Sequence, residues 1–140
     1  MLAYRAAERH PLVESYLATQ VPAPLQPARE IAAGDFMLRF FLEHRHGHRD
    51  LALVDYFQSG WSLARTLRQV LAWRWGEHLP GRVLDFACGF GRGTRYLVRL
   101  LPAETVTVAD IFAEAVAFQR QLLGVRGFVS AADPGVVRCE

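Results

Sequence analysis

The residues best suited to chemistry form one short block, which runs from Asp85 to Gly93 and has glycines at alternate positions near its end. A second acid, Asp110, follows Gly91 by about 20 residues, at the end of a β-branched run. Glycines let a backbone approach a ligand because they carry no Cβ, and an acid at this distance can accept hydrogen bonds from ribose hydroxyls. The pattern therefore indicates a pocket for a nucleoside-containing cofactor.

The glycine spacing alone leaves the kind of cofactor open. The helix expected after the glycines would point its free N–H groups and the positive end of its dipole at an anionic group. Gly89 and Gly91 match the dinucleotide fingerprint G-x-G-x-x-G, but Thr94 stands where its third glycine belongs. A Walker phosphate loop is excluded because the chain contains no lysine. A nicotinamide dinucleotide (NAD) therefore stays an alternative ligand.

The block also resembles motif I of the class I S-adenosylmethionine-dependent methyltransferases, which reads hydrophobic-Leu-Asp-x-Gly-x-Gly-x-Gly. Ala87 stands where the first glycine of that motif usually lies. The run ending at Asp110 resembles the family's ribose-binding strand, and residues 128–133 resemble its third strand and adenine loop. The resemblance covers residues 82–133, and these positions match motif I: Val83, Leu84, Asp85, Gly89 and Gly91.

The resemblance implies that S-adenosylmethionine is the cofactor. Asp85 would orient the glycine loop or hold the cofactor's methionine amino group. Asp110 would hold the ribose hydroxyls, and Asp133 would accept a hydrogen bond from the adenine amine. The backbone beside the cofactor would belong to Ala87, Gly89 and Gly91. Methyl transfer in this family depends mainly on proximity and alignment, so these residues indicate neither a catalytic side chain nor the methyl acceptor.

The elements expected around the block alternate between strand and helix. Strands are predicted at 82–87, 105–110 and 127–130, the first of them buried, and helices at 94–101 and 112–123. This β-α-β-α-β order is typical of an α/β fold with a parallel sheet and right-handed crossovers. The resemblance implies a Rossmann-like half-fold, with three of the family's seven strands and the first of them at an edge. Such an edge favours pairing with a second copy of the chain, unless residues 51–61 cover it.

Two regions are expected, a helical region over 1–80 and the cofactor-binding half-domain over 81–140. The function then has three readings. The chain is a methyltransferase-like protein whose activity as a half-fold is open, a fragment of an NAD-dependent oxidoreductase, or a non-catalytic interaction module that keeps the fold.

The helical region shows apolar spacing for several helices. Helices are predicted over 11–20, after Asp35 as N-cap, over 50–57 and over 62–78. Tyr56 and Ser59 precede the last of these helices and would either cover the cofactor or pack in the core.

Other reactive side chains are expected to have ordinary roles. His44, His46 and His48 alternate in a glycine-containing loop without a carboxylate or cysteine at ligand spacing, so no metal site is predicted. Cys88 has no identifiable base and is predicted to pack. A solvated helix face is expected for the three arginines of the following helix: Arg92, Arg95 and Arg99.

The composition is that of a folded domain. The chain has 140 residues, of which 51% are hydrophobic, and its formal net charge is +2. This balance does not indicate nucleic acid as a partner, and no segment reaches the roughly 18 apolar residues of a membrane span. Two cysteines make no disulfide framework. We therefore expect a soluble cytoplasmic protein.

Overall fold

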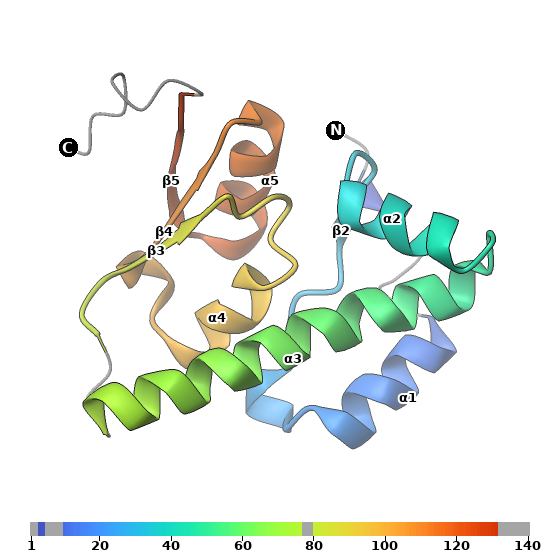
Figure 1. Cartoon of the computed structure of the whole chain (residues 1–140), viewed down its shortest axis with the longest axis horizontal. Coiled ribbons are helices and arrows are strands. Elements are labelled where there is room, and N and C mark those ends of the chain that lie inside the picture. Colours follow the sequence, from blue (N-terminus) through green and yellow to red (C-terminus); the bar gives the residue numbers. More distant parts are fainter. Residues whose placement is uncertain (1–2, 5–9, 77–79, 132–140) are drawn as a thin grey trace.

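The computed structural model describes residues 3–4, 10–76 and 80–131. In these ranges a helical region precedes a small parallel sheet (Figure 1). The elements in chain order are β1 (Ala3–Tyr4), α1 (Pro11–Gln20), the 3-10 helix η2 (Ala23–Leu25), β2 (Ile31–Ala32), α2 (Phe36–His44), α3 (Arg49–Trp75), β3 (Val83–Phe86), α4 (Thr94–Leu100), the 3-10 helix η3 (Ala103–Thr105), β4 (Val106–Asp110), α5 (Ala113–Leu123) and β5 (Arg126–Val129).

The sheet has the strand order β3-β4-β5, and both pairings are parallel. Val83 of β3 pairs with Val106 of β4, and Thr107 of β4 pairs with Arg126 of β5. The helices α4 and α5 connect successive strands, as parallel pairing requires. The predicted α/β fold with β-α-β-α-β order is therefore confirmed.

Strand β3 lies at an edge of the sheet within the described part of the chain, and it is not buried as the sequence predicted. Val83 packs in the core that α4 and α5 form with the sheet. Leu84 and Phe86 are 50% and 62% exposed. Successive side chains of a strand point to opposite faces, so α4 and α5 cover one face of β3 and leave the other open.

The helical region forms a second core, which α1, α2 and α3 build together. Val13, Leu17, Leu53 and Phe57 are fully buried in it. Tyr96 of α4 also belongs to this core, so the start of α4 packs against the helical region. Figure 1 shows α3 passing along both α1 and α4.

Two of the predicted helix starts are confirmed. Helix α1 spans the predicted Pro11–Gln20. Asp35 caps α2, because its Oδ1 accepts hydrogen bonds from the amides of Met37 (2.9 Å) and Leu38 (3.3 Å).

Helix α3 is continuous over 27 residues, so the predicted separate helices over 50–57 and 62–78 are wrong. Gly60 lies inside this helix, and its role is packing. A Cβ at Gly60 would clash with the carbonyl oxygen of Arg92 and lie 2.9 Å from Tyr96 Cε2. A glycine there lets α3 approach the start of α4 closely.

None of the helices in the described ranges combines the length and the apolar character needed to cross a membrane.

Candidate cofactor-binding site

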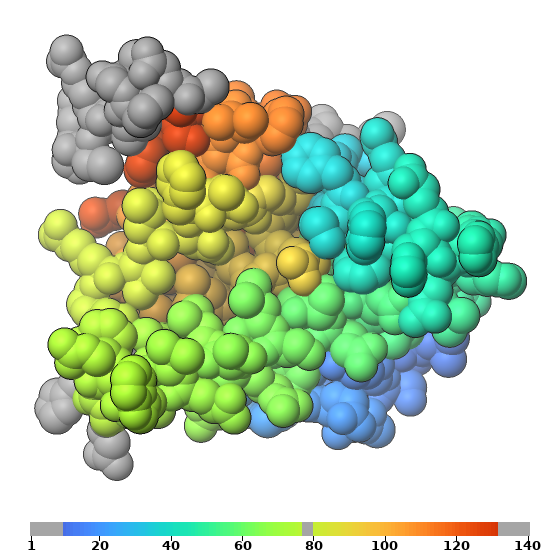
Figure 2. Space-filling view, viewed as in Figure 1, coloured from blue at the N-terminus to red at the C-terminus, as the bar shows by residue number. Residues whose placement is uncertain are grey.

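A pocket of about 260 Å³ lies beside the glycine loop, which we define as residues 87–93, between β3 and α4. The loop forms one side of the pocket. Asp35, Phe36 and Met37 at the start of α2 form another, and Asp85 and Asp110 line it from the ends of β3 and β4. Figure 2 shows the loop (yellow) adjoining α2 (blue-green) and α3 (green) at the surface. The pocket is therefore built by both regions of the chain.

Four of the six predicted site residues line this pocket: Asp85, Ala87, Gly89 and Asp110. Gly91 belongs to the loop but does not line the pocket, and Asp133 lies outside the described residues. A Cβ at Gly91 would lie 2.8 Å from Gln119 Oε1, so this glycine accommodates a neighbouring side chain of α5.

The glycine loop adopts left-handed backbone conformations. Gly89 has φ +54° and Gly91 has φ +81°, values that favour glycine. Ala87 has φ +55° in the position where the resembled motif has glycine. Alanine in this conformation costs about 1–2 kcal/mol, so the departure from the motif introduces strain while the loop keeps its path.

Asp110 connects the end of β4 to the glycine loop. Its Oδ2 accepts a hydrogen bond from the amide of Gly89 at 2.8 Å, and its Oδ1 accepts one from the amide of Phe112 at 3.1 Å. The second bond closes the turn before α5. An ionised carboxylate offers about four lone-pair sites, so Asp110 retains acceptor capacity toward the pocket.

Asp85 is held by the first residue of α4. The Thr94 hydroxyl donates a hydrogen bond of 2.6 Å to its Oδ2. Burial raises the pKa of the Asp85 carboxyl above its ordinary value; the Thr94 hydrogen bond lowers it, and the negative charge of Asp110 raises it further. The two carboxylates therefore repel each other across the pocket, and a positively charged group between them would relieve that repulsion.

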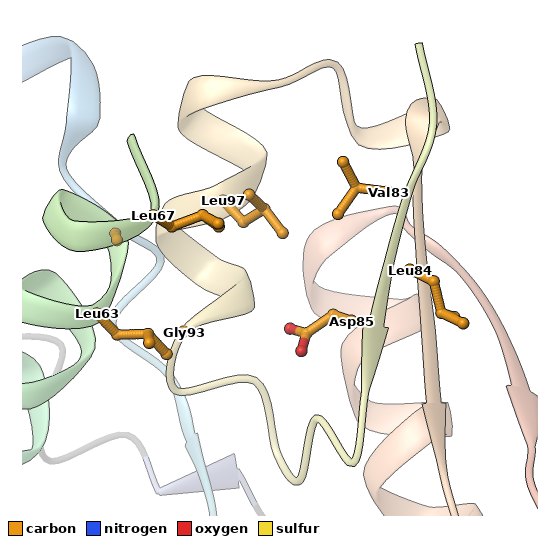
Figure 3. Close-up of a pocket in the computed structure, with 8 residues that line it drawn as sticks. Leu63, Leu67, Val83, Leu84, Asp85, Gly93 and Leu97 are labelled. Carbon is orange, nitrogen blue, oxygen red and sulfur yellow. The ribbon is translucent and has the colours of Figure 1, made fainter. Parts of the chain in front are cut away.

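A second cavity of about 240 Å³ adjoins the first, because Leu63, Asp85 and Gly93 line both. Figure 3 shows it between α3, α4 and β3, with Asp85 pointing into it from the strand. Leu67 and Leu97 make its wall apolar. Taken together, the two cavities reach the size range of small-molecule sites, roughly 300–1,000 Å³.

Gln119 of α5 supports the loop from behind, and the sequence reasoning missed it. The side chain is fully buried, and its Nε2 donates to the carbonyl oxygen of Gly89 at 2.8 Å and to Cys88 Sγ at 2.9 Å. Its Oε1 has no hydrogen-bond partner among the described residues. The available signal was a polar residue four positions after Ala115, on the apolar face of the predicted helix.

Cys88 packs against this glutamine. Burial raises the pKa of its thiol to about 11, while the hydrogen bond from Gln119 acts in the opposite direction. The thiol is therefore protonated at neutral pH, which supports the predicted packing role over a nucleophilic one.

The expected solvated face of α4 is wrong for one of the three arginines. Arg95 is 0% exposed, and its guanidinium donates to backbone carbonyl oxygens and to the hydroxyl of Tyr56. Arg99 is exposed, and Arg92 is half-buried beside the pocket. The short helix α4 packs against both regions of the chain, so it has little surface left for solvent.

The remaining predicted side chains lie away from the pocket. Tyr56 is fully buried in the helical core, and the Ser59 hydroxyl donates to its carbonyl oxygen. Of the two roles expected for this pair, packing in the core is therefore the one that the structure shows. The three histidines between 44 and 48 are exposed, and the described part of the chain contains no cluster of three or more potential metal ligands.

No family model matches this sequence, and no curated protein or solved structure matches it significantly.

Proposed function

We propose that this chain binds S-adenosylmethionine in the pocket beside the glycine loop, as a class I methyltransferase-like protein with a Rossmann-like fold. The observation that carries the proposal is the charge of the pocket. Among the described residues, Asp35, Asp85 and Asp110 line it together with one basic side chain, Arg92. S-adenosylmethionine presents a sulfonium and an amino group, which suit an acidic lining, whereas the pyrophosphate of NAD does not.

The start of α4 supports the same choice. The amide of Arg95 donates to the carbonyl oxygen of Gly91, and the amides of Tyr96 and Leu97 donate to that of Gly93. A pyrophosphate at a dinucleotide loop relies on free amides of the first helical turn. The Leu97 bond is the ordinary first bond of the helix, but Arg95 and Tyr96 belong to the first turn. Because their amides have partners within the chain, fewer amides remain there for a phosphate.

The residues around the pocket would divide the work of binding. Asp110 would accept hydrogen bonds from the ribose hydroxyls, and Asp85 would hold the amino group. The exposed side chains of Ile111 and Phe112, directly after Asp110, offer an apolar surface for the adenine. The adenine role of Asp133 stays a prediction. When bound, S-adenosylmethionine supplies an electrophilic methyl group, and the chain's own contribution is to hold and align.

Calorimetric titration of the purified chain with S-adenosylhomocysteine and, separately, with NADH tests this proposal. We expect saturable binding of S-adenosylhomocysteine and none of NADH. Binding of NADH alone would favour the oxidoreductase reading, and binding of neither would favour a non-catalytic module. Either of these results would overturn the proposal.

A pair of glycine variants locates the site. Valine at position 89 cannot adopt the left-handed φ of the parent without strain, so Gly89→Val is expected to abolish S-adenosylhomocysteine binding. Gly81→Val is the matched control, because a Cβ there meets nothing within 4 Å and its backbone is not left-handed. Circular dichroism checks that both variants keep their helices. Parent-like affinity in Gly89→Val would exclude the loop as the site.

A further inference from the structure

A single buried arginine joins the glycine loop to the helical region. Arg95 Nε donates to the carbonyl oxygen of Gly91 at 3.1 Å. Its Nη1 donates to the carbonyl oxygens of Ala28 (2.9 Å) and Glu30 (3.0 Å), in the segment before β2. Its Nη2 donates to the hydroxyl of Tyr56 on α3 at 3.1 Å. One guanidinium therefore fixes two separate segments of the chain relative to the loop.

The connection continues to the opposite side of the pocket. The Tyr56 hydroxyl, which accepts from Arg95, donates to Asp35 Oδ2 at 2.7 Å. The other oxygen of Asp35 caps α2, and Asp35 itself lines the pocket. A continuous set of hydrogen bonds thus runs from Gly91 through Arg95 and Tyr56 to Asp35, behind the pocket and out of contact with solvent.

The buried positive charge of Arg95 explains why its guanidinium makes so many hydrogen bonds. A buried guanidinium is costly unless its donors are satisfied and its charge is compensated. Arg95 Cζ lies 5.1 Å from the ring centroid of Tyr56 and 5.6 Å from that of Phe57, which adds cation–π attraction. Among the described residues, Asp35 is the carboxylate that compensates the charge of Arg95, and the Tyr56 hydroxyl lies between the two. Asp35 is therefore held by the Tyr56 hydroxyl at one oxygen and by the amides of Met37 and Leu38 at the other.

We propose that Arg95 is a positioning residue, which acts through Tyr56. It holds the glycine loop and the Asp35 side of the pocket in the relative position that the ligand needs. This inference rests on the proposed function, because it concerns the same pocket. Arg95 and Tyr56 would therefore affect ligand affinity, although neither of them lines the pocket. The pocket is also expected to form only when both regions of the chain are packed together.

Two matched tyrosine variants of the full chain test this inference. Tyr56→Phe removes the hydroxyl that links Arg95 to Asp35 and keeps the ring. Tyr96→Phe removes a hydroxyl that is also buried and donates to the carbonyl oxygen of Phe57 at 2.9 Å, outside the network. Tyr56→Phe loses two buried hydrogen bonds, one from Arg95 and one to Asp35, whereas Tyr96→Phe loses one, so Tyr56→Phe should lose more stability. We expect Tyr56→Phe to weaken S-adenosylhomocysteine binding about ten-fold and Tyr96→Phe to leave it unchanged.

Amide hydrogen exchange gives a readout that needs no ligand. The amides of Met37 and Leu38 are bonded to Asp35, so they should exchange faster in Tyr56→Phe than in the parent and keep the parent rate in Tyr96→Phe. If the parent binds no S-adenosylhomocysteine but this exchange pattern appears, the proposed function fails and the coupling between Tyr56 and the α2 cap stands. Unchanged exchange in Tyr56→Phe, or equal losses of affinity in the two variants, would overturn the positioning role.

Discussion

Residues 10–76 and residues 80–131 bury their apolar surface in different ways. The helical region encloses a core in which Tyr56 and Phe57 have no exposed surface. The sheet region is covered on one face, and the other face leaves Leu84 and Phe86 largely exposed at an open edge. The candidate pocket lies where the closed region meets the open one. The helical region thus supplies one wall of the pocket, including Asp35, while the sheet region supplies the glycine loop and the other two acids, Asp85 and Asp110.

The largest expected effect concerns the residue that joins the two regions. Arg95→Met removes the guanidinium donors to the carbonyl oxygens of Ala28, Glu30 and Gly91, so we expect it to lower the free energy of unfolding by about 3–5 kcal/mol. Arg99→Met, on the exposed side of the same helix, should change it by less than about 0.5 kcal/mol. Urea unfolding measures both. Equal values would show that Arg95 is as solvated as the sequence suggested.

A smaller effect is expected where α3 crosses the start of α4. In Gly60→Ala the new Cβ would meet the Arg92 carbonyl oxygen, and we expect a loss of about 1–3 kcal/mol in the free energy of unfolding. Gly81→Ala is the control, because a Cβ there has open space. Alanine favours a helix over glycine by about 1 kcal/mol. A more stable Gly60→Ala protein would therefore mean that α3 and α4 are not in close contact.

The features that could be predicted from the sequence are those that depend on residues close together in the chain. Asp35 as an N-cap, helix α1 and the alternation of strands and helices after residue 82 follow from side-chain spacing and capping chemistry within a few residues. The continuity of α3 through Gly60 was not predicted, because a glycine weakens a helix unless a neighbouring element needs the space. That neighbour, the Arg92 carbonyl, is far along the chain, so no local pattern reports it.

The same difference between local and distant contacts explains why only part of the candidate site was predicted. The loop, Asp85 and Asp110 share one β-α-β unit, whose geometry brings them to the carboxyl ends of adjacent strands. The contribution of Asp35 to the pocket and the burial of Arg95 depend on how α2 and α3 pack on that unit. An arginine two residues after a glycine loop reads as solvated until its distant partners, such as Tyr56, are known.

The pH dependence of stability is expected to reflect the Asp85 carboxyl of the pocket. The pKa of Asp85 is raised in the folded chain, chiefly by burial. The folded state therefore binds this proton more tightly than the unfolded state, and the resulting stability is present below the ordinary pKa near 3.8 and lost as pH rises through the raised value. Asp85→Asn should lack this loss, so its stability relative to the parent should increase with pH. Parallel pH profiles of the two proteins would contradict this account.

The weakest effect is expected at the open edge of the sheet. Strand β3 has an unpaired edge in the described chain and two exposed apolar side chains, so we expect two copies to pair through it at high concentration. Light scattering should show an apparent mass that rises with concentration for the parent and less for Phe86→Lys. Trp73→Lys, a change at a side chain that is 84% exposed on α3, should behave like the parent. A parent that stays monomeric throughout would exclude this pairing.

The affinity of S-adenosylhomocysteine for an Asp110 variant tests the central claim, that the acids beside the glycine loop hold a nucleoside cofactor. Asp110→Ala removes the proposed ribose acceptor and should weaken binding by about 1–3 kcal/mol. Glu104→Ala removes an exposed acid in η3, before β4, and should bind as the parent does. Calorimetry on the parent and both variants at one pH decides the matter. Equal affinity of Asp110→Ala and the parent would mean that Asp110 only ties Gly89 and Phe112 together, and would contradict the claim that this acid holds the ribose.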